Sequence, residues 1–188
     1  MEFPKSTKKR TLQIKYEESQ FEFGSGDKLM LKKEEIYASL IGTYLIRFSN
    51  LEHTLELGIA GLINDNNFDE GYVIIKDLDF SGKIELFYNI TLMFTNYTLK
   101  RRKQKINRLN SIKEKLQELS ILRNKIAHAK WYTLDSEGYI RVDTKMNKES
   151  GLIKFRKFKL TTNVIKNGIN DIKQLNAKLA IFLLEVRF

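Results

Sequence analysis

The segment from Arg123 to His128 carries side chains that suit chemistry on a phosphodiester. It reads Arg-Asn-Lys-Ile-Ala-His and ends on one of the two histidines in the chain. An arginine guanidinium can neutralise a phosphate, and a histidine imidazole can transfer a proton near neutral pH. Between them, Asn124 can hold a hydrogen-bond donor and an acceptor in place. Together these residue types indicate a site that acts on a phosphodiester.

The spacing of these residues limits how they can cooperate. On an ideal α-helix, Ser120, Asn124 and His128 share one face, because each is four residues from the next. Arg123 precedes His128 by five residues, which turns the two side chains roughly 140° apart around the axis. Both reach one phosphate only if Arg123 swings across or the helix end is distorted. Alternatively, two copies of the helix face each other and pool their residues.

Structural roles are open for the same kinds of residue. A histidine near the C-terminus of a helix is stabilised as a cation by the negative end of the helix dipole. Glu52 lies on an otherwise apolar helical stretch and could pair with Arg123 or Lys125 across a bundle. Its neighbour His53 is typical of a helix surface. With two histidines and no cysteine, a zinc site is unfavourable, and we expect no metal and no cofactor.

The chain is strongly basic, with 33 lysines and arginines against 23 acidic residues in 188 positions, a formal net charge of +10. Such a charge favours a polyanionic partner through long-range attraction and counterion release, although it also serves simple solubility. Basic residues cluster on both sides of the Arg123 segment. The candidate RNA-binding residues are Lys100, Arg101, Arg102, Lys130, Lys154 and Arg156.

Several classes of protein are disfavoured by composition. No apolar run reaches the roughly 18 residues of a membrane span, and the basic start of the chain leads into no apolar secretory segment. Without cysteine there is no disulfide framework and no thiolate metal site. We therefore expect a cytoplasmic protein that does not associate with a membrane.

Apolar residues that recur at steps of three and four predict a mainly α-helical bundle. The expected helices run from about Lys33 to Leu62, from Ser81 as N-cap, from about Leu99 to Ala129, and from Thr161 or Thr162 as N-cap to near the C-terminus. Period-two patterns predict three short strands between the last two helices, at residues 131–134, 139–142 and 152–160. Residues 1–32 are expected to form a partly extended arm, and residues 33–188 the helical domain.

The segment Leu122–Trp131 resembles the signature of the HEPN superfamily, in which an arginine followed by a polar residue precedes a histidine by a few positions. Phe48–Glu52 is similar to the aromatic-plus-glutamate pattern of the family's early helix, and Asp79–Ile84 to the segment before its second helix. The likeness covers about residues 33–188 at the level of helix order and is specific only at the motif.

The resemblance implies a helical bundle that forms a homodimer, with both copies of the motif lining one cleft. Catalytic members are metal-independent endoribonucleases in which the ribose 2′-hydroxyl attacks the adjacent phosphate, leaving a 2′,3′-cyclic phosphate. Carried over, His128 would transfer the proton, Arg123 would bind the phosphate, and Asn124 would orient groups around it. Ser120, Glu52 and Lys125 are supporting candidates.

We therefore expect an RNA-cleaving homodimer with a composite active site, acting as a toxin or phage-defence effector with an antitoxin or activator protein as partner. The alternative is a catalytically silent HEPN-like module that binds RNA, a nucleotide or a protein partner.

Overall fold

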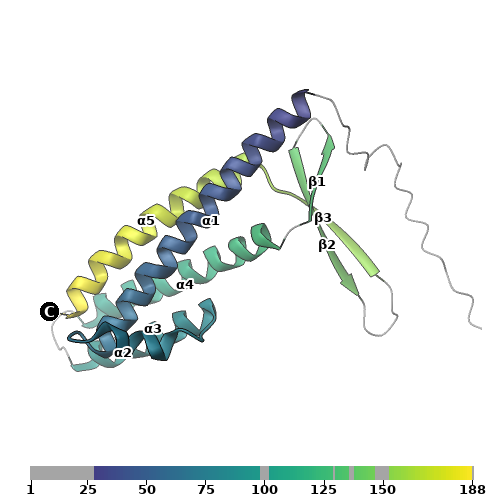
Figure 1. Cartoon of the computed structure of the whole chain (residues 1–188). Helices are drawn as coiled ribbons and strands as arrows, with labels where there is room; N and C mark the ends of the chain where they lie inside the picture. Colours follow the sequence, from purple (N-terminus) through teal and green to yellow (C-terminus); the bar gives the residue numbers. More distant parts are fainter. Residues whose placement is uncertain (1–27, 98–101, 129, 136–137, 147–152, 188) are drawn as a thin grey trace, which may run out of the picture.

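The computed structural model describes residues 28–97, 102–128, 130–135, 138–146 and 153–187. In this part of the chain, five helices surround one apolar core and three strands lie between the last two helices (Figure 1). The helices are α1 (Lys28–Ile63), α2 (Phe68–Ile75), α3 (Phe80–Tyr97), α4 (Arg102–Ala127) and α5 (Thr162–Arg187). The prediction of a mainly α-helical bundle is confirmed. Of the arm expected at residues 1–32, residues 1–27 lie outside the described residues.

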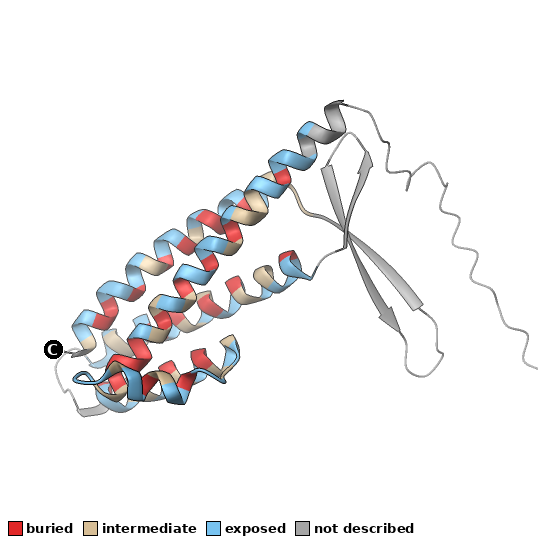
Figure 2. Ribbon diagram, viewed as in Figure 1, coloured by how far each residue is buried: buried red, intermediate tan, exposed pale blue. Residues whose placement is uncertain are grey.

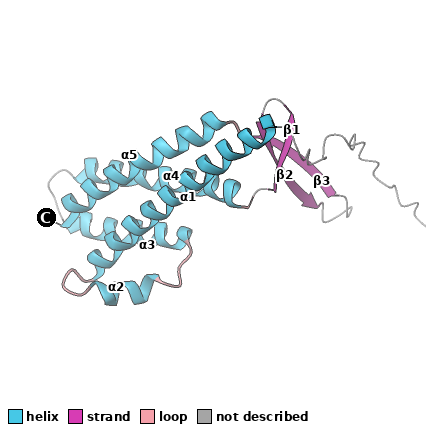
Figure 3. Ribbon diagram, turned by 45° about the horizontal axis from the view of Figure 1, so that its top comes forward, coloured by secondary structure: helices cyan, strands magenta, loops and turns pink. Residues whose placement is uncertain are grey.

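The long helices α1, α4 and α5 run side by side, with α2 and α3 packed against one end of them (Figures 1 and 3). Each of these helices turns one row of apolar side chains toward the core, as the buried positions in Figure 2 show. Burial of a leucine or phenylalanine stabilises the fold by about 1.5–3 kcal/mol. The largest fully buried side chains are Tyr44, Phe87, Phe182, Leu51, Leu55, Ile59, Ile75, Ile84, Leu109, Leu116, Ile126 and Ile165.

A glycine near the start of α5 sets the distance between α5 and α1. A Cβ added to Gly168 would lie 2.7 Å from a ring carbon of Tyr44 and 2.9 Å from Leu122. Both distances are shorter than van der Waals contact. The absence of a side chain at this position therefore lets α5 close over the buried Tyr44.

The helix ends differ in part from the expected ones. α1 begins at Lys28, before the expected start near Lys33, so the end of the predicted arm is helical. α3 begins at Phe80, and its N-cap is Asp79, whose carboxylate accepts a hydrogen bond from the Gly82 amide at 2.7 Å. The prediction of Ser81 as N-cap was wrong, because an aspartate two residues earlier is an equally good acceptor. At α5, Thr161 is the N-cap, and its hydroxyl accepts from the Val164 amide.

The short helix α2 was not predicted from the sequence. It follows the turn at residues 64–67, in which the Asn64 side chain accepts hydrogen bonds from the amides of Asn66 and Asn67. Asn67 then caps α2 by accepting from the Asp69 amide. A Cβ at Gly71 would lie 2.5 Å from the Cα of Ala60, so α2 packs directly onto the backbone of α1.

Between α4 and α5 the backbone forms an antiparallel sheet in the order β1-β2-β3, in the segment where the sequence indicates strands. The strands are β1 (Lys130–Asp135), β2 (Gly138–Met146) and β3 (Ile153–Lys159). Trp131 pairs with Arg141 across β1 and β2, and Arg141 with Phe158 across β2 and β3. None of the helices described here has the length and apolarity needed to cross a membrane.

Candidate functional site

Three helices that are far apart in the sequence enclose a cavity of about 380 Å³, which we call the Arg123 pocket. α1 and α4 supply its walls, and the first turn of α3 with its N-cap supplies the third side. The lining residues are Phe48, Glu52, Asp79, Phe80, Ser81, Ser120, Arg123 and Asn124. Four of the residues proposed from the sequence therefore meet in one place: Arg123, Asn124, Ser120 and Glu52.

The Arg123 side chain is positioned by two neighbours. Its guanidinium carbon lies 5.9 Å from the centroid of the Phe48 ring, and its Nη1 donates a hydrogen bond to Oδ1 of Asn124 at 3.0 Å. Among the described residues, no carboxylate forms an ion pair with this guanidinium. A partly exposed guanidinium that is oriented but not neutralised retains the donors and the charge that bind a phosphate.

The ring beneath Arg123 is itself fixed by aromatic packing. Phe48 is 3% exposed, and its ring centroid lies 4.8 Å from that of Phe80, with 54° between the ring planes. On its other side it stacks on Tyr44 at 6.5 Å. This row joins α1 to the start of α3, so aromatic packing between the two helices holds the floor of the pocket.

A hydrogen bond of Tyr44 links α1 to α4, one helical turn before Phe48. The side chain of Tyr44 is completely buried, and its hydroxyl donates to the carbonyl oxygen of Leu119 at 3.1 Å. Burial, helped by the negative charge of Asp171, raises the pKa of Tyr44 well above the ordinary value of tyrosine. The hydroxyl therefore stays protonated and keeps donating, which fixes the position of Ser120 and Arg123 relative to α1.

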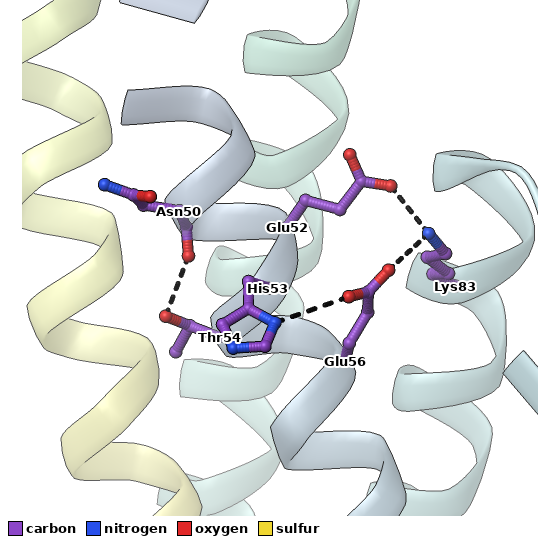
Figure 4. Close-up of polar contacts among 6 residues, drawn as sticks. All are labelled: Asn50, Glu52, His53, Thr54, Glu56 and Lys83. Atoms are coloured by element: carbon purple, nitrogen blue, oxygen red, sulfur yellow. Dashed lines mark hydrogen bonds and ion pairs between the residues drawn. The ribbon is translucent and has the colours of Figure 1, made fainter. Parts of the chain in front are cut away.

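Glu52 is held by a lysine that the sequence analysis did not single out. Lys83 of α3 is 7% exposed, and its Nζ lies 2.7 Å from Oε1 of Glu52 and 2.6 Å from Oε1 of Glu56 (Figure 4). Burial alone would lower the pKa of Lys83, but the hydrogen bonds and charges of the two glutamates outweigh it and raise the pKa above its usual value. The expected pairing of Glu52 with Arg123 or Lys125 was wrong, because Glu52 pairs with Lys83 of α3 instead.

The ion-pair network around Lys83 extends through Glu56 to His53, the histidine of α1. His53 is 63% exposed, and its Nδ1 lies 3.6 Å from Oε2 of Glu56 (Figure 4). Glu56 accordingly bridges the surface histidine and the buried lysine, whereas Glu52 alone of the two glutamates lines the pocket. The interpretation of His53 as a helix-surface residue is confirmed.

His128 lies outside the Arg123 pocket. It is exposed, directly follows the last residue of α4, and donates its backbone N–H to the carbonyl of Asn124 at 3.1 Å. The helical hydrogen bonding thus continues to His128 without distortion, so the expected angular offset from Arg123 is kept. Lys125, in the last turn of α4, is also exposed and does not line the pocket.

The candidate RNA-binding residues are described only in part. Arg102 is exposed at the start of α4. Lys100 and Arg101 lie outside the described residues. Lys130 begins β1, and Lys154 and Arg156 lie in β3, where the backbone is described and the side chains are not. A basic RNA-binding surface remains a prediction.

Four lining residues were not predicted as site residues from the sequence: Phe48, Asp79, Phe80 and Ser81. The signal for them was present, because two of the segments that resemble the HEPN pattern, Phe48–Glu52 and Asp79–Ile84, contribute all of them. No three histidine, aspartate or glutamate side chains of the described residues gather as a metal ion would require. Comparison of the chain with protein-family models, with curated proteins and with solved structures found no match.

Proposed function

We propose that this protein is a metal-independent endoribonuclease whose active site combines the Arg123 pocket with His128. The observation that carries the proposal is the Arg123 guanidinium, which is oriented by Phe48 and Asn124, in no described ion pair, and open to a cavity of about 380 Å³. The resemblance of the surrounding motif to the HEPN signature supplies the reaction class.

In the proposed reaction the ribose 2′-hydroxyl attacks the adjacent phosphorus, and the bond to the 5′-oxygen of the next nucleotide breaks. Arg123 binds the phosphate and stabilises the negative charge that develops on its oxygens. His128 transfers a proton to or from one of the two reacting oxygens, which suits an imidazole near neutral pH. Asn124 keeps the guanidinium in place through its hydrogen bond.

A homodimer would bring the two halves of this site together. Within one chain His128 does not line the pocket, and its position at the exposed end of α4 leaves it available to a second copy. We propose that His128 of one subunit acts on a phosphate bound by Arg123 of the other, in a protein that works in the cytoplasm as a toxin or phage-defence effector under the control of an antitoxin or activator.

The position of His128 outside the Arg123 pocket also favours a second function. If no second chain delivers the imidazole, the pocket still binds a phosphate, and the protein is a silent HEPN-like module that binds RNA, a nucleotide or a protein partner.

Cleavage of RNA by purified protein in excess EDTA distinguishes the two. The nuclease yields 2′,3′-cyclic phosphate ends, and Arg123→Ala and His128→Ala each lower the rate about 100-fold or more. Matched controls are Arg108→Ala, an exposed arginine of α4 paired with Glu185, and His53→Ala, the other histidine. Wild-type rates in both Arg123→Ala and His128→Ala would exclude the nuclease.

A further inference from the structure

The Arg123 pocket carries more negative charge than a phosphate site needs. Beside the one guanidinium it has two carboxylates, Glu52 and Asp79, and two hydroxyls, Ser81 and Ser120. The carboxylates of Glu52 and Asp79 would repel a ligand that carries only negative charge. The lining therefore suits a ligand that presents a phosphate at one end and hydrogen-bond donors at the other.

Of the two carboxylates, Glu52 is half-buried and Asp79 is exposed. Asp79 caps α3 through Oδ1. Glu52 uses Oε1 for Lys83, and its Oε2 forms no hydrogen bond within the described part of the chain. Figure 4 shows that oxygen on the side turned away from Lys83. The Lys83 ammonium fixes the position of the Glu52 carboxylate.

The pocket also offers an aromatic surface. Phe80 is half-buried, lines the cavity, and is held by its contact with Phe48. Unpaired bases of single-stranded RNA stack on such rings and are read by hydrogen bonds along their Watson–Crick edges. The volume of about 380 Å³ lies at the small end of ligand pockets, which suits one nucleotide.

We infer that the Arg123 pocket binds a guanine base next to the phosphate held by Arg123, with the Glu52 carboxylate as the group that selects it. Guanine alone among the four RNA bases presents two adjacent donors, N1–H and the N2 amino group, on its Watson–Crick edge. Adenine and cytosine pair one donor with an acceptor that a carboxylate repels, and uracil places its single N–H between two carbonyls. A carboxylate accepts two adjacent donors in bidentate fashion, and Oε1 of Glu52, which already accepts from Lys83, has a second lone pair for one of them. The inference rests on the proposed function, because the phosphate is the one that the nuclease cleaves.

Cleavage mapping on an RNA that contains every dinucleotide step tests the inference. Wild-type protein is expected to cut steps that carry guanosine on one fixed side of the phosphate roughly 5- to 150-fold faster than the others, the discrimination of one bidentate base contact. Glu52→Gln, which replaces one acceptor by a donor, is expected to lower cutting at guanosine steps to the rate of the others. The matched control is Glu56→Gln, which also loses a contact to Lys83 but does not line the pocket, and it keeps the preference.

A binding measurement separates this inference from the proposed function. Calorimetry with GMP, AMP, CMP and UMP should give the tightest binding for GMP, and Glu52→Gln should abolish the difference. Cleavage without guanosine preference, together with equal binding of the four nucleotides, would overturn the base-selecting role and leave the nuclease intact. Preferential GMP binding that depends on Glu52, in a protein that cleaves no RNA, would overturn the nuclease and leave the guanine pocket.

Discussion

The guanidinium of Arg123 lies over the ring of Phe48, 5.9 Å from its centroid, so a residue of α1 positions the side chain that α4 contributes to the pocket. Because Phe48 is in turn packed against Phe80, the three walls of the pocket are coupled through one aromatic ring. The arrangement gives Phe48 a role in function that its burial alone would not suggest.

Phe48→Leu is expected to lower RNA cleavage about tenfold, because the guanidinium loses the surface that orients it while the core keeps an apolar side chain. The control is Phe87→Leu, a fully buried phenylalanine of α3 that does not line the pocket. Both variants should lose about 1–3 kcal/mol of unfolding free energy in urea. Equal cleavage rates in the two variants would contradict a positioning role for Phe48.

Lys83→Met is expected to destabilise the protein by about 1–3 kcal/mol at pH 7, because it leaves Glu52 and Glu56 facing each other without a cation. The loss should be smaller than the 3–5 kcal/mol typical of a buried pair, since both carboxylates are partly exposed. Adding Glu56→Gln removes one of the two charges and should restore part of the stability. Urea unfolding of the single and double variants measures both effects, and an unchanged midpoint in Lys83→Met would contradict the account.

Stability is expected to fall as the pH rises above about 10, the ordinary pKa of tyrosine. The folded state holds the pKa of Tyr44 above that value by burial and by the charge of Asp171. Tyr44 therefore stabilises the fold fully below pH 10, and its contribution is lost progressively at higher pH. Urea midpoints between pH 8 and 11 should fall less steeply in Tyr44→Phe than in wild type. Tyr88→Phe, at a half-buried tyrosine of α3 whose hydroxyl donates to Asn110, is the control, and identical slopes in wild type and Tyr44→Phe would refute the prediction.

The two candidate caps of α3 can be told apart by alanine substitution. Asp79→Ala is expected to cost about 0.5–2 kcal/mol, because the Gly82 amide loses its acceptor. Ser81→Ala, at an exposed position inside the helix, should change stability by about 0.5 kcal/mol or less. Thermal unfolding followed by circular dichroism is sufficient, and a larger loss in Ser81→Ala than in Asp79→Ala would contradict the observed cap.

The sequence predicted most of the helical bundle because its signals are local. The apolar stripe that includes Tyr44, Phe48 and Leu55 follows the helical period and is buried as expected. α2 escaped prediction because its eight residues are too few to establish a period and its position depends on contact with α1. Helix starts were also uncertain, since Asp79 and Ser81 are both good caps and only the observed hydrogen bond separates them.

Most of the candidate site that could be predicted consists of residues that are close together in the sequence. Arg123, Asn124 and Ser120 were found because they share one helix, and all three line one cavity. The partner of Glu52 was missed because Lys83 lies on another helix, and the choice among several cations depends on packing that no local pattern encodes. Helix geometry correctly placed His128 and Arg123 on different faces, but it could not show that the pocket excludes His128.

Mixing two inactive variants tests most directly whether Arg123 and His128 from different subunits act on the same phosphate. In a mixed dimer of Arg123→Ala and His128→Ala, one composite site keeps both side chains and the other has neither. When equal amounts are allowed to exchange subunits, half of the dimers are mixed, so about a quarter of the wild-type cleavage rate should return. Recovery near that level is the predicted result. No recovery, with exchange verified and wild-type protein active, would contradict a site shared between subunits.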